Sequence, residues 1–299
     1  MDFKIAGISL YYIINWFFIY SFLGWLWESC FVSLKSGRLV NRGFINGPFC
    51  TIYGFGAVIV YLVMKNFDQN LLILYAGGTV VATALEFVTG WLMETIFHTR
   101  WWDYSKQKFN LHGYICLGAS LGWGVFTILL FYVFQPFVAW LTSLYPVPVG
   151  KVLMSILIAY YVVDFTSSAM AAFDIKKRLE KLEDVTEELI LFVHSTKLYE
   201  TKEEIRERLD EALTLNLTEA EYRLDVKKEE FIKKLEERLG YSEVREAKRA
   251  ELEKFMDEFK EKYISARKRS NIVGKRMVHA YPGLRKEFHR YKERKSRNK

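Results

Sequence analysis

The chain has 299 residues, of which 51% are hydrophobic and 16% aromatic, and its formal net charge is +7 at pH 7. Residues 1–174 hold nine Lys or Arg and eight Asp or Glu, whereas residues 175–299 hold 33 and 27. The first part is too apolar to fold in water, and the second is too charged for a large hydrophobic core. The composition excludes a single soluble globular domain and predicts a membrane domain, 1–174, followed by a charged helical tail, 175–299.

Five apolar stretches of the first part are long enough to cross a bilayer as helices, which takes about 20 residues. They cover roughly 9–34, 48–65, 70–97, 114–142 and 149–173. Basic residues gather in the loops after the first and third stretches and at the start of the tail. Because basic loops stay in the cytoplasm, we expect the N-terminus outside the cell and the tail inside. The predicted fold is all-α, a polytopic membrane protein with five transmembrane helices and a cytoplasmic helical or coiled-coil tail.

An internal repeat connects the first four stretches. Eight of the 33 positions from 24 to 56 are identical to the residue 66 positions later, where membrane composition alone gives roughly two or three. They include the pairs Gly24/Gly90, Trp25/Trp91, Glu28/Glu94, Gly47/Gly113, Cys50/Cys116 and Gly56/Gly122. We therefore predict a two-helix unit that occurs twice in the same orientation, near 10–66 and 76–132, with the fifth helix outside the repeat.

Each repeat unit places a glutamate, Glu28 or Glu94, near the cytoplasmic end of its first helix. A carboxylate at this depth is costly unless it faces protein or water and has a partner. Arg42 could pair with Glu28, and Arg100 or Lys108 with Glu94. The glutamates either lock their hairpins structurally or line a functional polar cavity, and the residues leave both readings open.

Two further acids lie deeper in the apolar stretches. Glu86 is two helical turns before Glu94 on a similar face, and Asp164 is in the middle of the fifth stretch. Glu86, Glu94 and Asp164 are thus the candidates for a polar cavity or transport path that attracts a cation or proton. Interhelical hydrogen bonding is the alternative reading.

Aromatic and small residues predict which parts of these helices meet the membrane interface and which meet other helices. Tryptophans such as Trp25 and Trp91 are expected to anchor in an interfacial belt, together with Trp101 and Trp102. Gly118 and Gly122 form a small-xxx-small pattern, which predicts close helix packing inside the fold.

The tail has the composition of a helical domain with a basic end. Leu179, Leu182, Leu189 and Val193 follow an approximate heptad, and helices are expected from Thr218 to about Leu239 and over 242–266. Residues 267–299 hold thirteen Lys or Arg and two Glu. Such a cluster can bind anionic lipid, and the candidates are Arg267, Lys268, Arg269, Lys275 and Arg276. A plain solvated terminus is the alternative, and nucleic acid is not the expected partner because a tethered tail meets lipid first.

Sequence motifs for catalysis are missing from the chain. There is no GxxxxGK[ST], HExxH or CxxC pattern, and the five histidines have no metal-ligand spacing. We therefore expect no catalytic residues, no metal and no cofactor.

Several segments together resemble the CmpB-like family of bacterial membrane proteins. The resemblance rests on FLGWLWE, RGFINGPFCTIYGFG, LEFVTGWLMETIF, WWDYSKQKFNLHGYICLGASLGWG and, more loosely, MVHAYPGLRKE. Members are named as ABC-transporter type IV permeases, which implies a transporter permease component that works with a separate cytoplasmic ATPase. The alternative is a membrane-anchored scaffold whose tail binds protein partners or anionic lipid.

Overall fold

A computed structural model describes residues 3–195, 201, 205, 217–239, 243–268, 273, 276–277 and 280–281 of the chain. The chain forms two compact units, one made of Met1–Phe173 with Ile272–Lys299 and the other of Asp174–Asn271. We call the first the membrane unit and the second the helical unit. The predicted membrane domain, 1–174, and tail, 175–299, stay a prediction, and the compact units differ from them in that Ile272–Lys299 is grouped with Met1–Phe173.

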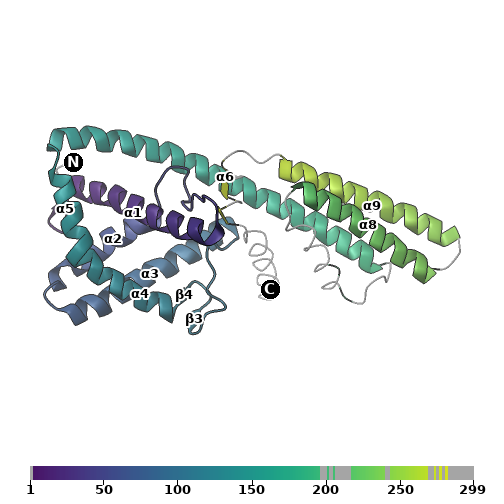
Figure 1. The fold of residues 1–299 in the computed structure, drawn as a ribbon, viewed down its shortest axis with the longest axis horizontal. Coiled ribbons are helices and arrows are strands. Elements are labelled where there is room, and N and C mark those ends of the chain that lie inside the picture. The colour runs from purple at the N-terminus through teal and green to yellow at the C-terminus, as the bar shows by residue number, and fades with distance from the viewer. Residues whose placement is uncertain are drawn as a thin grey trace. The chain divides into compact units, whose positions relative to one another are not determined.

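The membrane unit consists mainly of long apolar helices (Figure 1). A small hairpin of β1 (Lys4–Ile5) and β2 (Ile8–Ser9) precedes α1 (Leu10–Ser36), α2 (Thr51–Met64) and the short 3-10 helix η1 (Lys65–Phe67). Then come α3 (Leu71–Phe97), the hairpin β3 (Asn110–Leu111) and β4 (Ile115–Cys116), and α4 (Leu117–Leu129). Asn70 caps α3, since its side chain accepts hydrogen bonds from the amides of Leu72 and Ile73.

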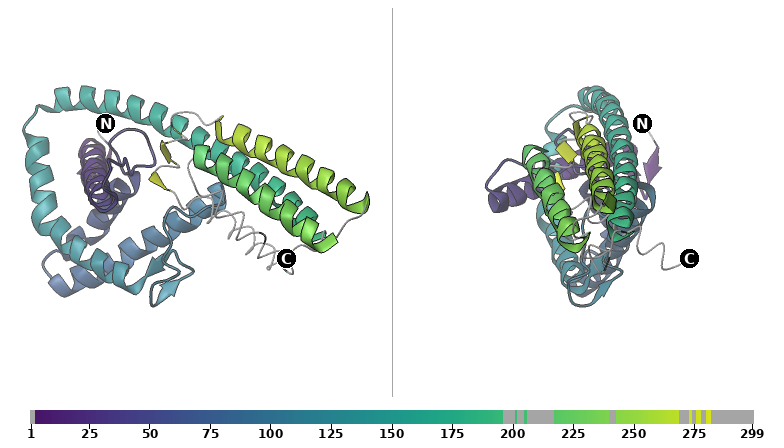
Figure 2. Two further views of the ribbon diagram at one scale, coloured as in Figure 1. Left: turned by 45° about the vertical axis from the view of Figure 1, so that its right-hand side comes forward. Right: turned by 90° about the vertical axis from the view of Figure 1, so that its right-hand side faces the viewer.

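The fourth predicted stretch is a bent helix in three parts. After α4 the chain forms a π-helical turn, η2 (Leu130–Phe134), and continues as α5 (Gln135–Ser143). Pro136 has no amide hydrogen to bond the carbonyl of Tyr132, and the amide of Gln135 bonds the carbonyl of Leu130 instead. The chain accordingly changes direction between α4 and α5 (Figure 2).

Four helical stretches in the described part of the chain are long and apolar enough to cross a membrane: Leu10–Ser36, Leu71–Phe97, Leu117–Ser143 and Val147–Ser195. Thr51–Phe67 is also apolar but shorter. The mostly helical, multi-span fold is therefore confirmed, and the fifth span stays a prediction. Cys50 and Cys116 occupy the N-cap positions of α2 and α4. These helices thus begin 66 residues apart, although the repeat itself stays a prediction.

Small residues bring the helices together at positions other than those expected. A side chain at Gly24 would overlap the ring of Tyr53, and one at Gly78 would overlap Thr127. These contacts join α1 to α2 and α3 to α4. Gly118 and Gly122 have no atom within 4 Å of the place where a Cβ would lie. The prediction that they mediate packing inside the fold is therefore wrong.

The helical unit has its own hydrophobic core, contrary to the expectation from its charge. It contains the second part of α6 (Val147–Ser195), with α8 (Leu217–Leu239) and α9 (Glu243–Lys268). Leu189 and Val193 of α6, Phe231 of α8 and Phe259 of α9 are buried in one cluster. The apolar faces suffice because they all turn inward, while ion pairs such as Lys228–Asp257 lie outside. The side chains of Leu182, Thr218 and Glu221 lie outside the described residues.

Candidate functional site

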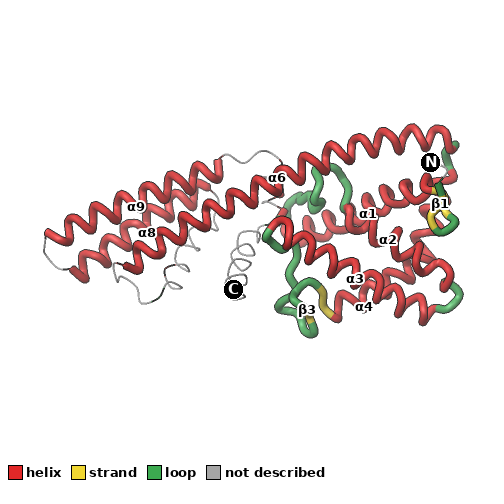
Figure 3. The backbone as a smooth tube through the Cα atoms, turned by 180° about the vertical axis from the view of Figure 1, so that it is seen from behind, coloured by secondary structure: helices red, strands yellow, loops and turns green. Residues whose placement is uncertain are grey.

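Two loops at the same end of the membrane unit gather most of its polar contacts. The first polar loop, residues 37–50, follows α1, and the second polar loop, residues 98–116, follows α3. Both lie opposite the β1–β2 hairpin (Figure 3). The four acids singled out in the sequence are each bonded to a residue of one of these loops.

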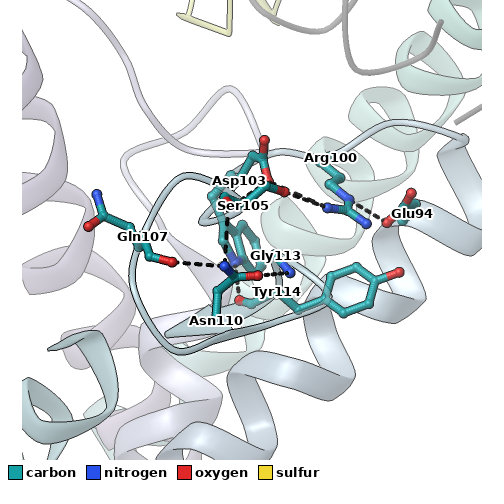
Figure 4. A network of polar contacts seen from close by, with 9 residues as sticks. Glu94, Arg100, Asp103, Ser105, Gln107, Asn110, Gly113 and Tyr114 are labelled. Atoms are coloured by element: carbon teal, nitrogen blue, oxygen red, sulfur yellow. Dashed lines mark hydrogen bonds and ion pairs between the residues drawn. The ribbon is translucent and has the colours of Figure 1, made fainter. Parts of the chain in front are cut away.

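Glu94 forms a buried ion pair with Arg100 of the second polar loop. The Nε atom of Arg100 donates to Glu94 Oε2 at 2.6 Å, and the two side chains are 6% and 5% exposed. Arg100 also bonds Asp103 at 3.4 Å, and its guanidinium stacks on the ring of Tyr114 (Figure 4). Burial lowers the pKa of Arg100, but the hydrogen bond and charge of Glu94 outweigh it, so the pKa is raised. The ion pair holds the loop against α3.

The second polar loop is shaped by bonds within itself. Asn110 donates to the carbonyl of Gln107 at 2.8 Å and accepts from the amide of Gly113 at 3.1 Å (Figure 4). Gly113 has a φ of 76°, and a Cβ there would lie 2.5 Å from Arg100 Nη1. This left-handed backbone and the arginine beneath it both require glycine.

Glu86 lies deeper in α3 and has only neutral partners. The hydroxyl of Tyr104 donates to its Oε1 at 3.2 Å, and the indole nitrogen of Trp123 donates to its Oε2 at 2.9 Å. Glu86 is 6% exposed, and no cation pairs with it among the described residues. It differs in this respect from Glu28 and Glu94, which both face an arginine.

Glu28 of α1 is bonded to the first polar loop and is less buried than Glu94. Arg42 Nε lies 3.4 Å from Glu28 Oε2, with the two side chains 22% and 33% exposed, and the hydroxyl of Tyr53 donates to Glu28 Oε1 at 3.0 Å. The indole nitrogen of Trp25 donates to Asn41 Oδ1. Glu28 thus pairs with Arg42 as expected, and of the two partners considered for Glu94, Arg100 and Lys108, the pair forms with Arg100.

The matched glycines of the predicted repeat, Gly24 and Gly90, contact different parts of the structure. Gly24 of α1 lies against Tyr53 of α2 and so serves the packing of two helices. Gly90 is buried in α3, and a Cβ there would lie 3.2 Å from the ring of Trp102 and 3.2 Å from the ring of Tyr114. Both rings belong to the second polar loop. Gly24 therefore makes room for a helix and Gly90 for a loop, and the equivalence of these two positions in a repeat stays a prediction.

Asp164 of α6 holds the turn of the first polar loop. It accepts hydrogen bonds from the amide of Asn46 at 3.1 Å, from the Asn46 side chain at 3.0 Å and from the amide of Gly47 at 2.6 Å. A Cβ on Gly47 would lie 2.5 Å from the hydroxyl of Tyr160 and 3.0 Å from Asp164 Oδ2. Gly47 thus allows the loop to approach α6 closely.

Ala280 and Tyr281 complete the first polar loop, which the sequence did not indicate. Arg42 Nη1 donates to the carbonyl of Ala280, and the Arg42 guanidinium lies 4.1 Å above the ring of Tyr281. The hydroxyl of Tyr281 in turn donates to the carbonyl of Arg42. Ala280 and Tyr281 belong to the segment MVHAYPGLRKE, which resembles the family only loosely. Its sequence does not show that it contacts Arg42.

The tryptophans divide between the interior and the surface. Trp91 is 50% exposed, which fits an interfacial position. Trp101 is buried against Phe44, Phe97 and Tyr281, so its predicted place in the aromatic belt is wrong. Trp102 is half-buried, and its indole nitrogen donates to the carbonyl of Tyr114. These rings pack the two polar loops.

Comparison with known proteins identifies the family of the chain. The model of the family described as "Putative ABC-transporter type IV" matches residues 15–169, which is more than half of the chain. The chain belongs to this ABC-transporter type IV family. No curated protein and no solved structure matches it.

The family match spans both polar loops and all four acids. It runs from within α1 to a point five residues after Asp164, so the polar contacts of Glu28, Glu86 and Glu94 belong to the family region. The helical unit and the segment of Arg276 and Tyr281 lie outside it. The membrane-spanning character and the predicted resemblance are thereby confirmed.

Proposed function

We propose that the chain is a non-catalytic permease component of a transport system, and that Glu86 lies on its polar path. The family description and the apolar helices support a membrane transport role. The observation that carries the proposal is the absence of a cation beside Glu86 in the described part of the chain. A buried carboxylate with a fixed ion pair has no reason to exchange a proton or cation, whereas one held by neutral donors can do so.

The contacts of the other acids favour a structural role. Asp164 accepts three hydrogen bonds from the first polar loop, and the charge of Glu94 is met by Arg100. Their predicted place on a transport path stays a prediction. Our proposal nevertheless places only Glu86 on the path and has Glu28, Glu94 and Asp164 hold the polar loops in place.

The proposed topology follows from the basic loops. With five spans and the N-terminus outside, both polar loops and the helical unit face the cytoplasm of a bacterial cell. A separate ATPase would then meet the polar loops or the helical unit on that side. The lipid bilayer is the other expected partner.

The proposal is tested with purified protein in vesicles that contain a pH-sensitive dye. A potassium diffusion potential drives protons inward, and the dye reports their entry. The full chain is expected to carry protons faster than empty vesicles, and Glu86→Gln should abolish this flux. Glu28→Gln is the control, because Glu28 also lies in an apolar helix but is paired with Arg42. Equal flux in the full chain and in Glu86→Gln would overturn the assignment of Glu86.

A scaffold function is the second candidate, supported by the separate core of the helical unit. A unit that folds around its own core can present a stable surface to a protein partner. Crosslinking in native membranes followed by isolation of the chain separates the two functions. A crosslinked ATPase supports the permease, and other stable partners without an ATPase support the scaffold.

A further inference from the structure

Arg276 lies in a ring of acceptors on the first polar loop. Its Nε donates to Asn46 Oδ1 at 3.0 Å, its Nη1 to the carbonyl of Gly43 at 2.7 Å and its Nη2 to the carbonyl of Phe44 at 2.8 Å. Nη1 is also 3.4 Å from the carbonyl of Asn41. All three guanidinium nitrogens are therefore bonded to one short turn, residues 41–46.

The turn has this shape for reasons that lie outside Arg276. Asp164 fixes both the amide and the side chain of Asn46, which leaves Asn46 Oδ1 to face the arginine. Asn41 bonds the carbonyl of Asn46 and the amide of Gly43, closing the turn on itself. A Cβ on Gly43 would lie 2.9 Å from the carbonyl of Phe49, so the chain can fold this tightly only with glycine.

Other described residues near Arg276 also pack inside the membrane unit. Val273, Arg276, Met277 and Ala280 have helical backbone, and the amide of Tyr281 bonds the carbonyl of Met277. Met277 and Ala280 are buried, and Tyr281 packs on Trp101 and Arg42. Arg276 is therefore one contact of a larger docked surface that also includes Met277, Ala280 and Tyr281.

We propose that the turn 41–46 is an arginine-binding site whose ligand is Arg276 of the same chain, and that Asp164 sets its shape. The chain leaves the membrane unit after Phe173 and returns to it at Ile272. The site therefore fastens the returning end, so that the helical unit is attached to the membrane unit at both of its ends. This inference does not depend on the transport proposal.

The contacts explain why the ligand is an arginine rather than a lysine. A guanidinium is planar and can donate to several acceptors in one plane, whereas an ammonium is a point charge. Burial lowers the pKa of Arg276, while Tyr281 and Asp164 raise it, and arginine remains protonated at physiological pH. The carbonyl dipoles of Gly43 and Phe44 stabilise its positive charge. Asp164 contributes through Asn46, whose side chain bonds both residues.

Arg276 was also a candidate for binding anionic lipid, together with Arg267, Lys268, Arg269 and Lys275. The side chains of those four lie outside the described residues. The donors of Arg276 face the turn 41–46, which leaves the guanidinium little capacity for a lipid phosphate. The lipid reading and the docking reading thus make opposite predictions for this residue.

Hydrogen exchange of the full chain in lipid nanodiscs tests the proposal. Arg276→Lys keeps the positive charge but loses the planar donor set, and exchange of the amides of residues 41–47 should rise about tenfold, the effect of one lost charge-assisted hydrogen bond. Asp164→Asn should give the same rise and should also release residues 276–281, although Asp164 does not touch Arg276. Arg249→Lys, an exposed arginine of α9, is the control and should change neither segment.

Two results would overturn the proposal. One is unchanged exchange of residues 41–47 and 276–281 in Arg276→Lys, with wild-type thermal unfolding. The other is exchange of residues 276–281 that slows in wild-type protein only when anionic lipid is added to zwitterionic nanodiscs, which would identify lipid as the ligand. Arg276→Lys retains the charge, so the test remains decisive even if Asp164→Asn does not fold.

Discussion

The two polar loops end at matching sequence positions, Cys50 and Cys116, but they are stabilised in different ways. The second closes on itself, because Arg100 reaches back six residues to Glu94 and Asn110 organises the turn. The first depends on distant segments, since Asp164 of α6 and the segment of Arg276 and Tyr281 complete it. Glu28 and Glu94 thus occupy the same place in the predicted repeat, but the ion pair of Glu94 holds its loop by itself, whereas the loop beside Glu28 also needs distant segments.

The difference shows that two copies of a sequence motif can form ion pairs with residues at different positions of their loops. Lys108 lies 66 residues after Arg42, yet it is exposed, and Arg100 has taken its place beside Glu94. The Glu94 pair is buried, whereas the Glu28 pair is accessible to water. The first loop is therefore the one that other segments can hold or release.

The largest effect is expected for the buried pair of the second loop. Arg100→Ala removes the buried cation beside Glu94, which should lower the free energy of unfolding by about 3–5 kcal/mol and reduce the yield of folded protein. Thermal unfolding in detergent measures this change. Lys108→Ala is the control and should have little effect. If Arg100→Ala and Lys108→Ala behave alike, the ion pair does not hold the loop.

Glycine substitutions compare the two loops at equivalent positions. Gly113→Ala combines a positive φ with overlap on Arg100, and Gly47→Ala only crowds Tyr160 and Asp164. Gly47→Ala should destabilise by about 1–3 kcal/mol, and Gly113→Ala by more. Gly122→Ala should be neutral or stabilise α4, since open space surrounds that position. Melting temperatures of the three variants give the order, and a neutral Gly113→Ala would contradict this account of the second loop.

A smaller effect is expected for the exposed pair of the first loop. Glu28→Gln should cost no more than about 1 kcal/mol, because water screens partly exposed ion pairs. The Tyr53 hydroxyl can still donate to the amide oxygen. Denaturant titration beside Arg100→Ala measures the contrast. A loss for Glu28→Gln as large as for Arg100→Ala would remove the distinction between the loops.

The smallest expected effect is the release of Tyr281 from its docked position at alkaline pH. Burial raises the pKa of Tyr281, although Arg42 opposes the rise. An undocked tyrosine ionises near its ordinary pKa of 10.0, while the docked one keeps its proton. Docking is thus fully stable below pH 10 and should weaken as pH rises above it, because ionisation favours the undocked form.

Hydrogen exchange of residues 276–281, corrected for intrinsic rates, follows this release. Tyr281→Phe cannot ionise, so its release above pH 10 should be less steep than that of the wild type. Identical pH profiles would show that Tyr281 does not titrate with docking.

The sequence could predict those parts of the fold that depend on composition and local spacing. The apolar stretches, the ends of α3 and α8 and the pairing of Glu94 with a loop arginine all follow from residues close in the chain. The contacts of Asp164 with Asn46 and of Arg276 with Phe44 join residues more than 100 positions apart, and polar residues of these types fit many partners. The burial of Trp101 depends on Tyr281 in the same way.

The core of the helical unit was missed for a different reason. Its charge density hides apolar faces that become a core only when three helices meet. The bend at Pro136 was likewise concealed, because the apolar stretch continues through it.

The most direct test compares the two acids of α3 in one sample. Dicyclohexylcarbodiimide adds to protonated carboxyl groups in apolar surroundings, and mass spectrometry of the digested protein locates the adduct. If Glu94 is held in an ion pair and Glu86 is free to exchange its proton, Glu86 becomes labelled and Glu94 does not. Labelling of Glu94 with Glu86 unmodified would contradict the account.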